Sequence, residues 1–317
     1  MSIDVVCTGI LIADHLCSPI DRLPAPGELI LCDELPLAIG GCPANLAVDL
    51  ARLAVKANVV GCVGDDALGR FLIESLEQQG VDAGNVRALG GCATGGSLIL
   101  NVRGQDRRYI TTMGANDSLS PRDIPLQLLR EAKVFYVGGY LVTPGLEDEG
   151  LVDLFRQARA AGAKTVLDVV VVGGEDHWAR LEGLLPETDV FLPNRDEAKL
   201  ITGLDDPLEQ AEEFSRAGAG TVAITDGEAG AVLVSGDARL RSGIYPVDYV
   251  GGTGSGDAFS AGYILGLLEG GDTRACLQWG SAIGASCVRS VNASEGVFNR
   301  AEAEAFMREH RLEIEEI

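Results

Sequence analysis

The chain has 317 residues, 46% of them hydrophobic, which is enough to bury one large core or two smaller ones. Its 25 Lys and Arg residues against 47 Asp and Glu residues give a formal net charge of −22. This balance argues against nucleic acid and anionic membranes as main partners, because both require a basic surface. A small phosphorylated ligand is not excluded. The eight cysteines include no C-x-x-C pair, which predicts reduced thiols in a cytoplasmic protein without a zinc cluster.

The first apolar run, residues 4–13, predicts a buried strand that ends at Asp14. The run lacks a basic flank and is too short for a membrane span, so it is not expected to be a signal peptide. Side chains at the carboxyl end of a core strand sit where ligands bind in open α/β sheets, which makes Asp14 a candidate ligand-binding residue. Residues 15–39 are broken by Pro and Gly and predict short strands and turns that form a flap.

Glycines 40 and 41 then open an amphipathic helix, expected over residues 46–53 and preceded by Asn45. A core strand at 59–63 and a helix that ends near Gln79 follow. Residues 95–103 and 107–113 predict a hairpin, because they alternate in polarity and are separated by Gly-Gln-Asp. The hairpin supplies a second flap segment. Arg107 and Arg108 beside its turn favour either a solvated turn or recognition of a charged acceptor.

From residue 133 onward, predicted strands and helices alternate. The expected elements are strand 134–137, helix 150–161, strand 165–172, helix 177–184, strand 189–192, a helix opened by Asn194, strand 221–225 and a hairpin of 229–234 with 240–245. This alternation predicts an α/β fold with a mostly parallel central sheet and helices on both faces. No linker or repeat interrupts it, so we expect one domain over residues 1–317, with lid segments at about 15–39 and 95–113.

Residues 251–262, Gly-Gly-Thr-Gly-Ser-Gly-Asp-Ala-Phe-Ser-Ala-Gly, form a glycine-rich turn that leads into a helix. Crowded backbone N–H groups and the positive end of the helix dipole make such a turn an anion site. No lysine occurs in the stretch, so it is not a Walker A loop. A carboxylate in an anion site repels its ligand, so Asp257 is either a helix cap or a general base for phosphoryl transfer.

Two signatures, joined by a third, carry a family resemblance. They are Gly-Gly-x-x-x-Asn-x-Ala at residues 40–47, Asn-x-x-Glu at 194–197 and Thr-Gly-Ser-Gly-Asp-Ala-Phe at 253–259. In this order they resemble the ribokinase-like (PfkB) carbohydrate kinases, closest to the fructokinase and ribokinase types, over nearly the whole chain. The resemblance implies a three-layer ribokinase-like fold with a small β lid. It also implies phosphorylation of a primary hydroxyl of a small sugar, with ATP and Mg²⁺.

The resemblance also implies roles for particular residues. Asp257 looks like the catalytic base, beside an anion hole formed by the backbone of Gly254, Ser255 and Gly256. Residues expected to hold the acceptor are Asp14, Gly40, Gly41, Asn45 and Tyr140. Residues expected on the nucleotide side are Asn194, Glu197, Thr225, Asp226, Gly227 and Thr253. Among these, Glu197 and Asn194 would organise Mg²⁺ and its waters from the second shell, because Mg²⁺ keeps most of its water.

Some alternatives stay open at this level. Asn45 and Glu197 are also ordinary helix-start residues, and Asp14 is an ordinary turn residue. Many family members have Asp-Thr, part of a monovalent-cation site, where this chain has Gly251 and Gly252, so the sequence does not predict a potassium requirement. Tyr140 could stack on a base, which keeps a nucleoside acceptor possible, and a non-catalytic sugar-binding protein is the rival from another class. A homodimer through the lid strands is also expected from related kinases.

Overall fold

The computed structural model describes residues 3–105, 107–146, 149–173 and 176–317. The strands of its main sheet are β1 (Val5–Gly9), β4 (Ala57–Gly64), β5 (Asp82–Leu89), β8 (Val134–Gly138), β9 (Lys164–Leu167), β10 (Val190–Phe191), β11 (Thr221–Thr225), β12 (Ala231–Ser235), β13 (Ala238–Ser242) and β14 (Ile314–Glu316). The order across this sheet is β14-β13-β12-β11-β10-β9-β8-β1-β4-β5. All pairs from β11 to β5 are parallel, and the pairs from β11 to β14 are antiparallel.

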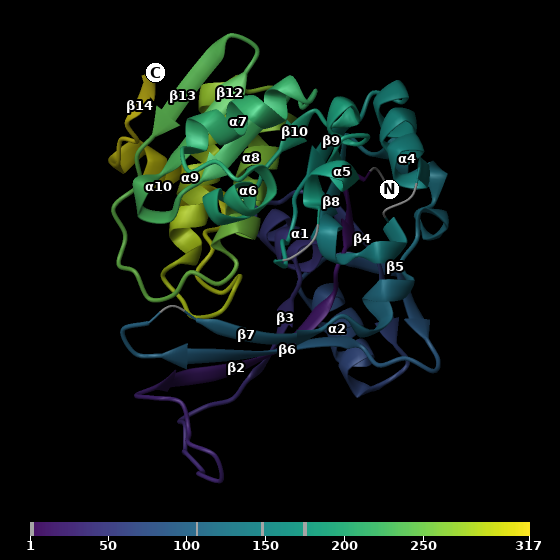
Figure 1. The fold of residues 1–317 in the computed structure, drawn as a ribbon, viewed down its shortest axis with the longest axis vertical. Coiled ribbons are helices and arrows are strands. Elements are labelled where there is room, and N and C mark those ends of the chain that lie inside the picture. The colour runs from purple at the N-terminus through teal and green to yellow at the C-terminus, as the bar shows by residue number, and fades with distance from the viewer. Residues whose placement is uncertain (1–2, 106, 147–148, 174–175) are drawn as a thin grey trace.

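Helices cover both faces of the sheet (Figure 1). They are α1 (Cys42–Arg52), α2 (Ala67–Gln78), α3 (Leu126–Glu131), α4 (Glu149–Ala160), α5 (His177–Leu181), α6 (Arg195–Thr202), α7 (Pro207–Arg216), α8 (Ser255–Leu268), α9 (Thr273–Cys287) and α10 (Arg300–Glu309). The predicted three-layer α/β fold with a mostly parallel sheet is therefore confirmed.

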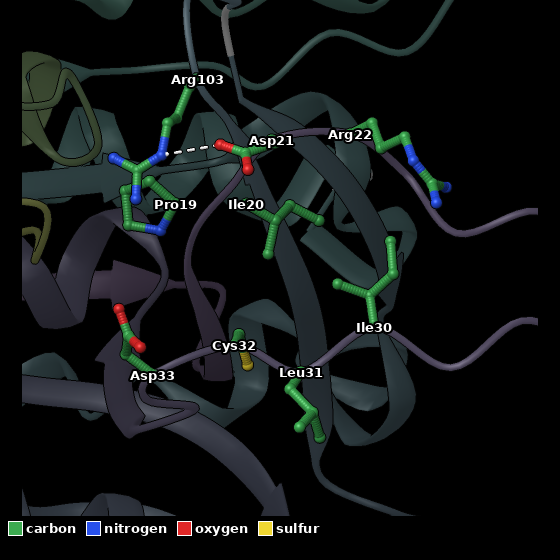
Figure 2. A pocket seen from close by; sticks show the side chains of 9 residues that line it. All are labelled: Pro19, Ile20, Asp21, Arg22, Ile30, Leu31, Cys32, Asp33 and Arg103. Carbon is green, nitrogen blue, oxygen red and sulfur yellow. Dashed lines mark hydrogen bonds and ion pairs between the residues drawn. The ribbon is translucent and has the colours of Figure 1, made fainter.

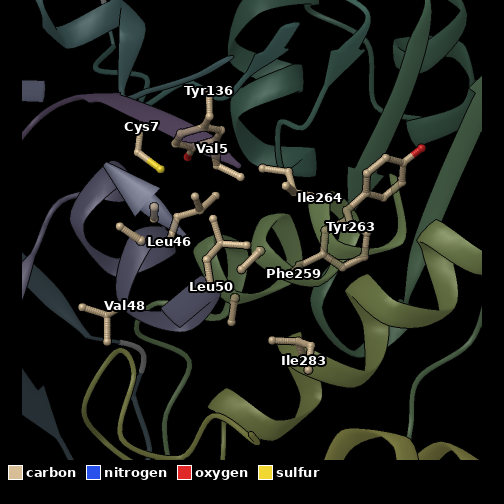
Figure 3. Close-up of a cluster of buried hydrophobic side chains, with 14 of the residues drawn as sticks. Val5, Cys7, Leu46, Val48, Leu50, Tyr136, Phe259, Tyr263, Ile264 and Ile283 are labelled. Atoms are coloured by element: carbon tan, nitrogen blue, oxygen red, sulfur yellow. The ribbon is translucent and has the colours of Figure 1, made fainter. Parts of the chain in front are cut away.

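The buried side chains of the strands alternate between two cores, as the two-residue repeat of a strand requires. Val5 and Cys7 of β1 face the core built with α1, α2, α8 and α9, while Val6 faces the core built with α3 to α7. In the first core, Leu46 and Leu50 of α1 lie toward Phe259 of α8 (Figure 3). This packing fixes the start of α1 beside the start of α8.

A second sheet forms the lid. Its strands are β2 (Ile12–Ile20), β3 (Leu37–Gly40), β6 (Gly95–Val102) and β7 (Arg108–Thr112), in the order β3-β2-β6-β7. The lid lies below the main sheet in Figure 1. The antiparallel pair of β6 and β7 is the predicted hairpin, and β2 with β3 falls in the predicted flap of residues 15–39.

The first predicted strand is wrong at its carboxyl end. Residues 4–13 do not form one strand, because β1 ends at Gly9 and the chain enters the lid as β2 at Ile12. Gly9 has φ +136, and a Cβ there would lie 1.9 Å from the carbonyl oxygen of Gly138. The apolar pattern continues through this break and therefore hides it. Asp14 consequently belongs to the lid, not to the end of a core strand.

Other boundaries also differ from expectation. The strand predicted at 165–172 ends at Leu167, so Asp168 lies beyond it. Helix α1 begins at Cys42, four residues earlier than predicted, because Pro43 fits the first turn of a helix. Strand β5 was not predicted, since its exposed half interrupts the apolar pattern. Among the described residues, no helix is both long enough and apolar enough to cross a membrane.

Candidate active site

The start of α8 forms an open backbone turn. Gly254 has φ +78, and a Cβ there would lie 2.5 Å from the carbonyl oxygen of Ala293, so only glycine fits. The first bond of the helix runs from the amide of Ala258 to Gly254 (2.9 Å), whereas the amide of Ser255 turns back to Gly252 (3.2 Å). No atom lies within 4 Å of a Cβ built on Gly256. The backbone at Gly256 therefore borders open space at the positive end of α8.

Asp257 lies in the first turn of α8 and faces the start of α1. The side-chain amide of Asn45 donates a hydrogen bond of 2.8 Å to its carboxylate. Burial raises the pKa of Asp257 to about 6, and hydrogen bonds from Asn45 and Cys42 oppose that rise. A carboxylate with such a pKa accepts a proton more readily than an ordinary aspartate and is still ionised at neutral pH.

Asp168, at the end of β9, lies beside Asp257. One ligand atom from each of Cys42, Asp168 and Asp257 falls within 4.8 Å of the others. Burial raises the pKa of Asp168 to about 8, and the charge of Asp257 adds to the rise, while the hydroxyl of Tyr136 donates a 2.7 Å bond that opposes it. Two acids packed this closely repel each other when both are ionised.

The Asn-x-x-Glu element caps α6. The side chain of Asn194 accepts from the amide of Glu197, and the side chain of Glu197 accepts from the amide of Asn194, each at 2.9 Å. Glu197 is thus also a helix-start residue, as its alternative interpretation predicts. Glu197 is electrostatically linked to the acidic residues, because burial raises its pKa and the charges of Asp168 and Asp257 add to the rise. Asn194 pairs in parallel with Thr225 at the end of β11.

The remaining predicted nucleotide-side residues follow β11 (Asp226 and Gly227) or precede α8 (Thr253). Asp226 forms an ion pair with Arg195 at 3.1 Å, so its carboxylate holds the start of α6 against the end of β11. Gly227 has φ +51 and no atom within 4 Å of its Cβ position. Thr253 is buried next to the glycine turn, and its carbonyl accepts from the thiol of Cys287.

The predicted acceptor residues meet where the lid joins α1. A Cβ on Gly40 would lie 2.1 Å from Oδ2 of Asp14, and Gly41 has φ +91 with the carbonyl of Ile10 2.2 Å from its Cβ position. Burial raises the pKa of Asp14 to about 7, a hydrogen bond with Ser97 opposes the rise, and the charge of Asp257 adds to it. The structure thus brings the lid acid and the first glycine loop together.

Tyr140 follows β8, and its backbone amide donates to the carbonyl of Asp168 at 3.3 Å. It is 4% exposed within the core built with α3 to α7, and its hydroxyl donates to the carbonyl of Arg180 at 3.1 Å. Gly139, with φ +72, directs the chain into this position. The hydroxyl of Tyr136 donates to the carboxylate of Asp168, whereas the hydroxyl of Tyr140 donates to a backbone carbonyl.

Arg107 reaches from the lid to the second glycine loop. Its Nη1 lies 2.8 Å from the position of a Cβ on Gly252, and the hydroxyl of Tyr249 lies 3.3 Å from the same point. The Nε group of Arg107 donates to the hydroxyl of Tyr109 on β7. A guanidinium therefore stands over the turn that sequence analysis identified as an anion site.

A magnesium ion fits the donor set of this centre. Besides burial, the charge of Asp257 raises the pKa of Asp168, and the charges of Asp168 and Asp257 raise the pKa of Glu197; a divalent cation bound among these carboxylates would reverse both charge effects. Oxygen atoms are the ligands that Mg²⁺ prefers. The thiol of Cys42 suits it poorly, and burial raises the pKa of that thiol further. Asp168 and Glu197 are therefore the residues suited to hold the ion or its waters.

The lid also carries a hollow, which is separate from the acidic centre of Asp168, Glu197 and Asp257. It has a volume of about 350 Å³, lies between the end of β2 and residues 30–33, and has the bond from Arg103 to Asp21 at its edge (Figure 2). None of the candidate active-site residues lines this hollow.

The family model for the pfkB family carbohydrate kinases matches residues 2–305. The chain belongs to this family. Among curated members, it is 29% identical to a ribokinase of Haemophilus influenzae, with 94% of this chain and 96% of that protein covered. It is 25% identical to an ATP-dependent 6-phosphofructokinase of Thermoanaerobacterium thermosaccharolyticum (92% and 89% covered) and 26% identical to a 5-dehydro-2-deoxygluconokinase of Geobacillus kaustophilus (86% and 85%).

Solved structures of pfkB-type proteins share the fold. An Arabidopsis thaliana ribokinase complexed with ribose and ATP superposes with a TM-score of 0.81 at 26% identity and covers 97% of this chain and 99% of its own. An E. coli protein in complex with ATP and Mg²⁺ gives 0.83 at 24% identity, covering 97% and 100%. The predicted family, ribokinase-like fold and sugar-kinase class are confirmed, whereas the role of each site residue stays a prediction.

Two residues of this pfkB site were missed or undervalued by sequence reasoning. Asp168 was counted inside an unbroken strand, although an acid after an apolar run is the signal that marks a strand end. Arg107 was weighed mainly as a solvated turn residue, because nothing in the sequence shows that the hairpin leans over the glycine loop.

Proposed function

We propose that this protein is an ATP- and Mg²⁺-dependent kinase that phosphorylates a primary hydroxyl of a small sugar, with Asp257 as general base. The observation that carries the proposal is the position of Asp257. Its carboxylate lies in the first turn of α8, next to an open glycine turn, and is held by Asn45 from the acceptor side. A pKa of about 6 suits it to take a hydroxyl proton at neutral pH.

The reaction transfers one phosphoryl group. Asp257 accepts the proton of the acceptor hydroxyl as that oxygen attacks the γ-phosphorus, and the bond from phosphorus to the β-γ bridging oxygen breaks to release ADP. We assign to the backbone of residues 254–256 the stabilisation of the charge that the equatorial oxygens of the phosphoryl group gain. Because the amide of Ser255 already donates to Gly252, we assign the larger part of this stabilisation to the turn at Gly256.

Asp168, Glu197 and Asn194 form the proposed magnesium side of the site. When bound there, Mg²⁺ supplies charge neutralisation for the nucleotide phosphates. Asn194 keeps Glu197 in place through the reciprocal capping bonds at the start of α6. Thr225, Asp226 and Gly227 border the proposed nucleotide pocket together with Thr253. The Gly251–Gly252 pair supplies no side-chain oxygens for a monovalent cation, so we expect no potassium requirement.

Asp14, Gly40, Gly41 and Asn45 form the proposed acceptor side. A vicinal diol offers two donors and four lone pairs, which a carboxylate and an amide can satisfy together. Gly40 and Gly41 leave room for the side chain of Asp14 and the carbonyl of Ile10 and so let Asp14 lie against the start of α1. The buried position of Tyr140 removes the aromatic surface that could have stacked on a nucleobase, and this favours a sugar over a nucleoside.

The lid completes the proposed site. Asp14 and Arg107 both belong to lid segments, so closure of the lid on the substrates would deliver their charges and exclude water, whose attack on ATP is the competing reaction.

Leu98 and Ile110 are exposed on the lid, which is compatible with the homodimer predicted through its strands. We retain one domain and a cytoplasmic location as predictions.

The test is a coupled assay of ADP release over hexoses, pentoses, keto-sugar acids, sugar phosphates and nucleosides, with and without potassium. We expect turnover with at least one sugar, dependent on Mg²⁺, and no stimulation by potassium. Turnover with nucleosides alone would reject the sugar assignment. ATP binding without turnover on any acceptor would favour a binding protein instead.

A further inference from the structure

Asp49 of α1 is a buried acid that the proposed reaction does not use. Its side chain is 0% exposed, and the described residues give neither oxygen a hydrogen bond of good geometry, although Ser294 lies near enough to favour the ionised form. Arg52, one turn along, donates instead to the carbonyls of Glu295 (3.4 Å) and Val297 (3.2 Å). Burial disfavours the charged form of a carboxyl group that lacks well-aligned hydrogen bonds, so this environment favours the neutral acid.

The groups around Asp49 support that reading. Burial raises the pKa of Asp49 well above its ordinary value, the charge of Asp257 raises it further, and Ser294 and Arg52 oppose the rise. Cys287 also lies close enough to sense the charge of Asp49. A neutral carboxyl has one O–H to donate, and it needs an acceptor.

Asn45, four residues earlier on α1, offers that acceptor. Its amide nitrogen donates to Asp257 at 2.8 Å, which leaves Oδ1 as the free end of the amide. Oδ1 is buried and also lacks a partner. Side chains four residues apart on a helix share one face, and the later side chain leans toward the earlier one. The buried donor of Asp49 and the buried acceptor of Asn45 therefore lie on the same face of α1.

We propose that Asp49 is a positioning residue whose protonated carboxyl donates to Oδ1 of Asn45 and so holds the amide with its NH₂ group toward Asp257. The inference rests on the proposed function, because the orientation matters to turnover only if Asp257 is the base. A reversed amide would place Oδ1 against the carboxylate of Asp257, where two acceptors repel. Asp49 thereby fixes the orientation of Asn45 and, through it, the catalytic carboxylate of Asp257, without touching a substrate.

The first experiment compares two substitutions of similar size. Asp49→Leu removes the donor, and we expect kcat to fall about tenfold with little change in the KM for ATP. Asp49→Asn retains an N–H donor for Oδ1 and should keep kcat within about threefold of the wild type. Asp49→Ala serves where the leucine variant does not fold. Equal loss in the leucine and asparagine variants overturns the proposal.

The second experiment asks whether Asp49 acts through Asn45. In an Asn45→Ala background, Asp49→Leu should cause no further loss of kcat, because the amide that it orients is gone. The same loss in both backgrounds overturns the proposal. Ser294→Ala is the matched control for the other polar neighbour and should keep wild-type kcat. If it reproduces the loss seen in Asp49→Leu, the acid acts through the loop at Ser294 instead.

A third readout needs no turnover. The infrared difference spectrum of wild type minus Asp49→Leu at neutral pH should contain a carboxylic acid band. A carboxylate band in its place overturns the inference. If no acceptor is phosphorylated in the assay above, the proposed function fails, while this spectrum still decides the protonation of Asp49.

Discussion

Two glycine loops meet at the site, and the lid places a charged side chain of opposite sign on each. The loop that opens α1 lies under Asp14, which occupies the space that a Cβ on Gly40 would need. The loop that opens α8 lies under Arg107, which stands beside the Cβ position of Gly252. At both loops, a glycine without a Cβ thus leaves room for a charged side chain, an acid at the first loop and a cation at the second.

The difference between the loops matches the two halves of the proposed reaction. A carboxylate beside the first loop can accept bonds from sugar hydroxyls, whereas a guanidinium beside the second can pair with phosphoryl oxygens. Asp257 lies between them, joined to the first loop by Asn45 and to the second by its own backbone. Substitutions on either side should therefore affect different kinetic constants.

The largest effect is expected at the residue shared by both loops. Asp257→Asn keeps the size of the side chain but cannot accept the hydroxyl proton, so kcat should fall by about 10² or more in the ADP-release assay. ATP affinity, measured by calorimetry, should change little. If the variant retains near-wild-type turnover on its best acceptor, Asp257 is not the base.

The pH profile gives an independent view of the same carboxylate. The folded pKa of Asp257 is raised to about 6, and only the deprotonated form acts as base. Activity is therefore full above that pKa and is lost as the pH falls through it. We expect kcat/KM to drop about tenfold or more between pH 7 and pH 5, because protonation of Asp14, whose pKa is raised to about 7, adds to the loss at Asp257. A profile that is flat over this range contradicts the assignment.

The comparison also shows what the sequence could predict. Both glycine loops and the lid hairpin could be predicted from the sequence, because they depend on local patterns: the spacing of glycines and the alternation of polar and apolar residues. The position of Asp14 was not found, because Ile10 and Leu11 continue the apolar run while the chain changes sheets. Contacts between elements, such as Arg107 on Gly252 or Asp49 behind Asn45, depend on packing that no single stretch encodes.

At the second loop, Arg107→Gln removes the cation while keeping a polar side chain. We expect kcat to fall about fivefold to tenfold, because phosphoryl charge that develops in the transition state loses a partner. Arg108→Gln is the matched control, since Arg108 is exposed on β7 and bonds to Gln105, and it should leave kcat unchanged. Equal effects of the two substitutions would show that only the general charge of the lid matters.

The smallest effects, and the sharpest comparison, come from adding one methyl group to each loop. Gly40→Ala places a Cβ 2.1 Å from Oδ2 and 2.4 Å from Cγ of Asp14, a side chain that is 7% exposed and has little room to move. Gly252→Ala meets the end of the long Arg107 side chain at 2.8 Å and the hydroxyl of Tyr249 at 3.3 Å, and both are side-chain ends that can shift aside.

We therefore expect Gly40→Ala to raise the acceptor KM about fivefold, or about 1 kcal/mol, with the KM for ATP unchanged. Gly252→Ala should instead lower kcat about twofold and leave the acceptor KM unchanged. Gly243→Ala, whose Cβ meets no atom within 4 Å, controls for the loss of backbone freedom. If both loop variants change the same constant, the two charges do not serve separate halves of the reaction, and the lid acts on the site as one unit.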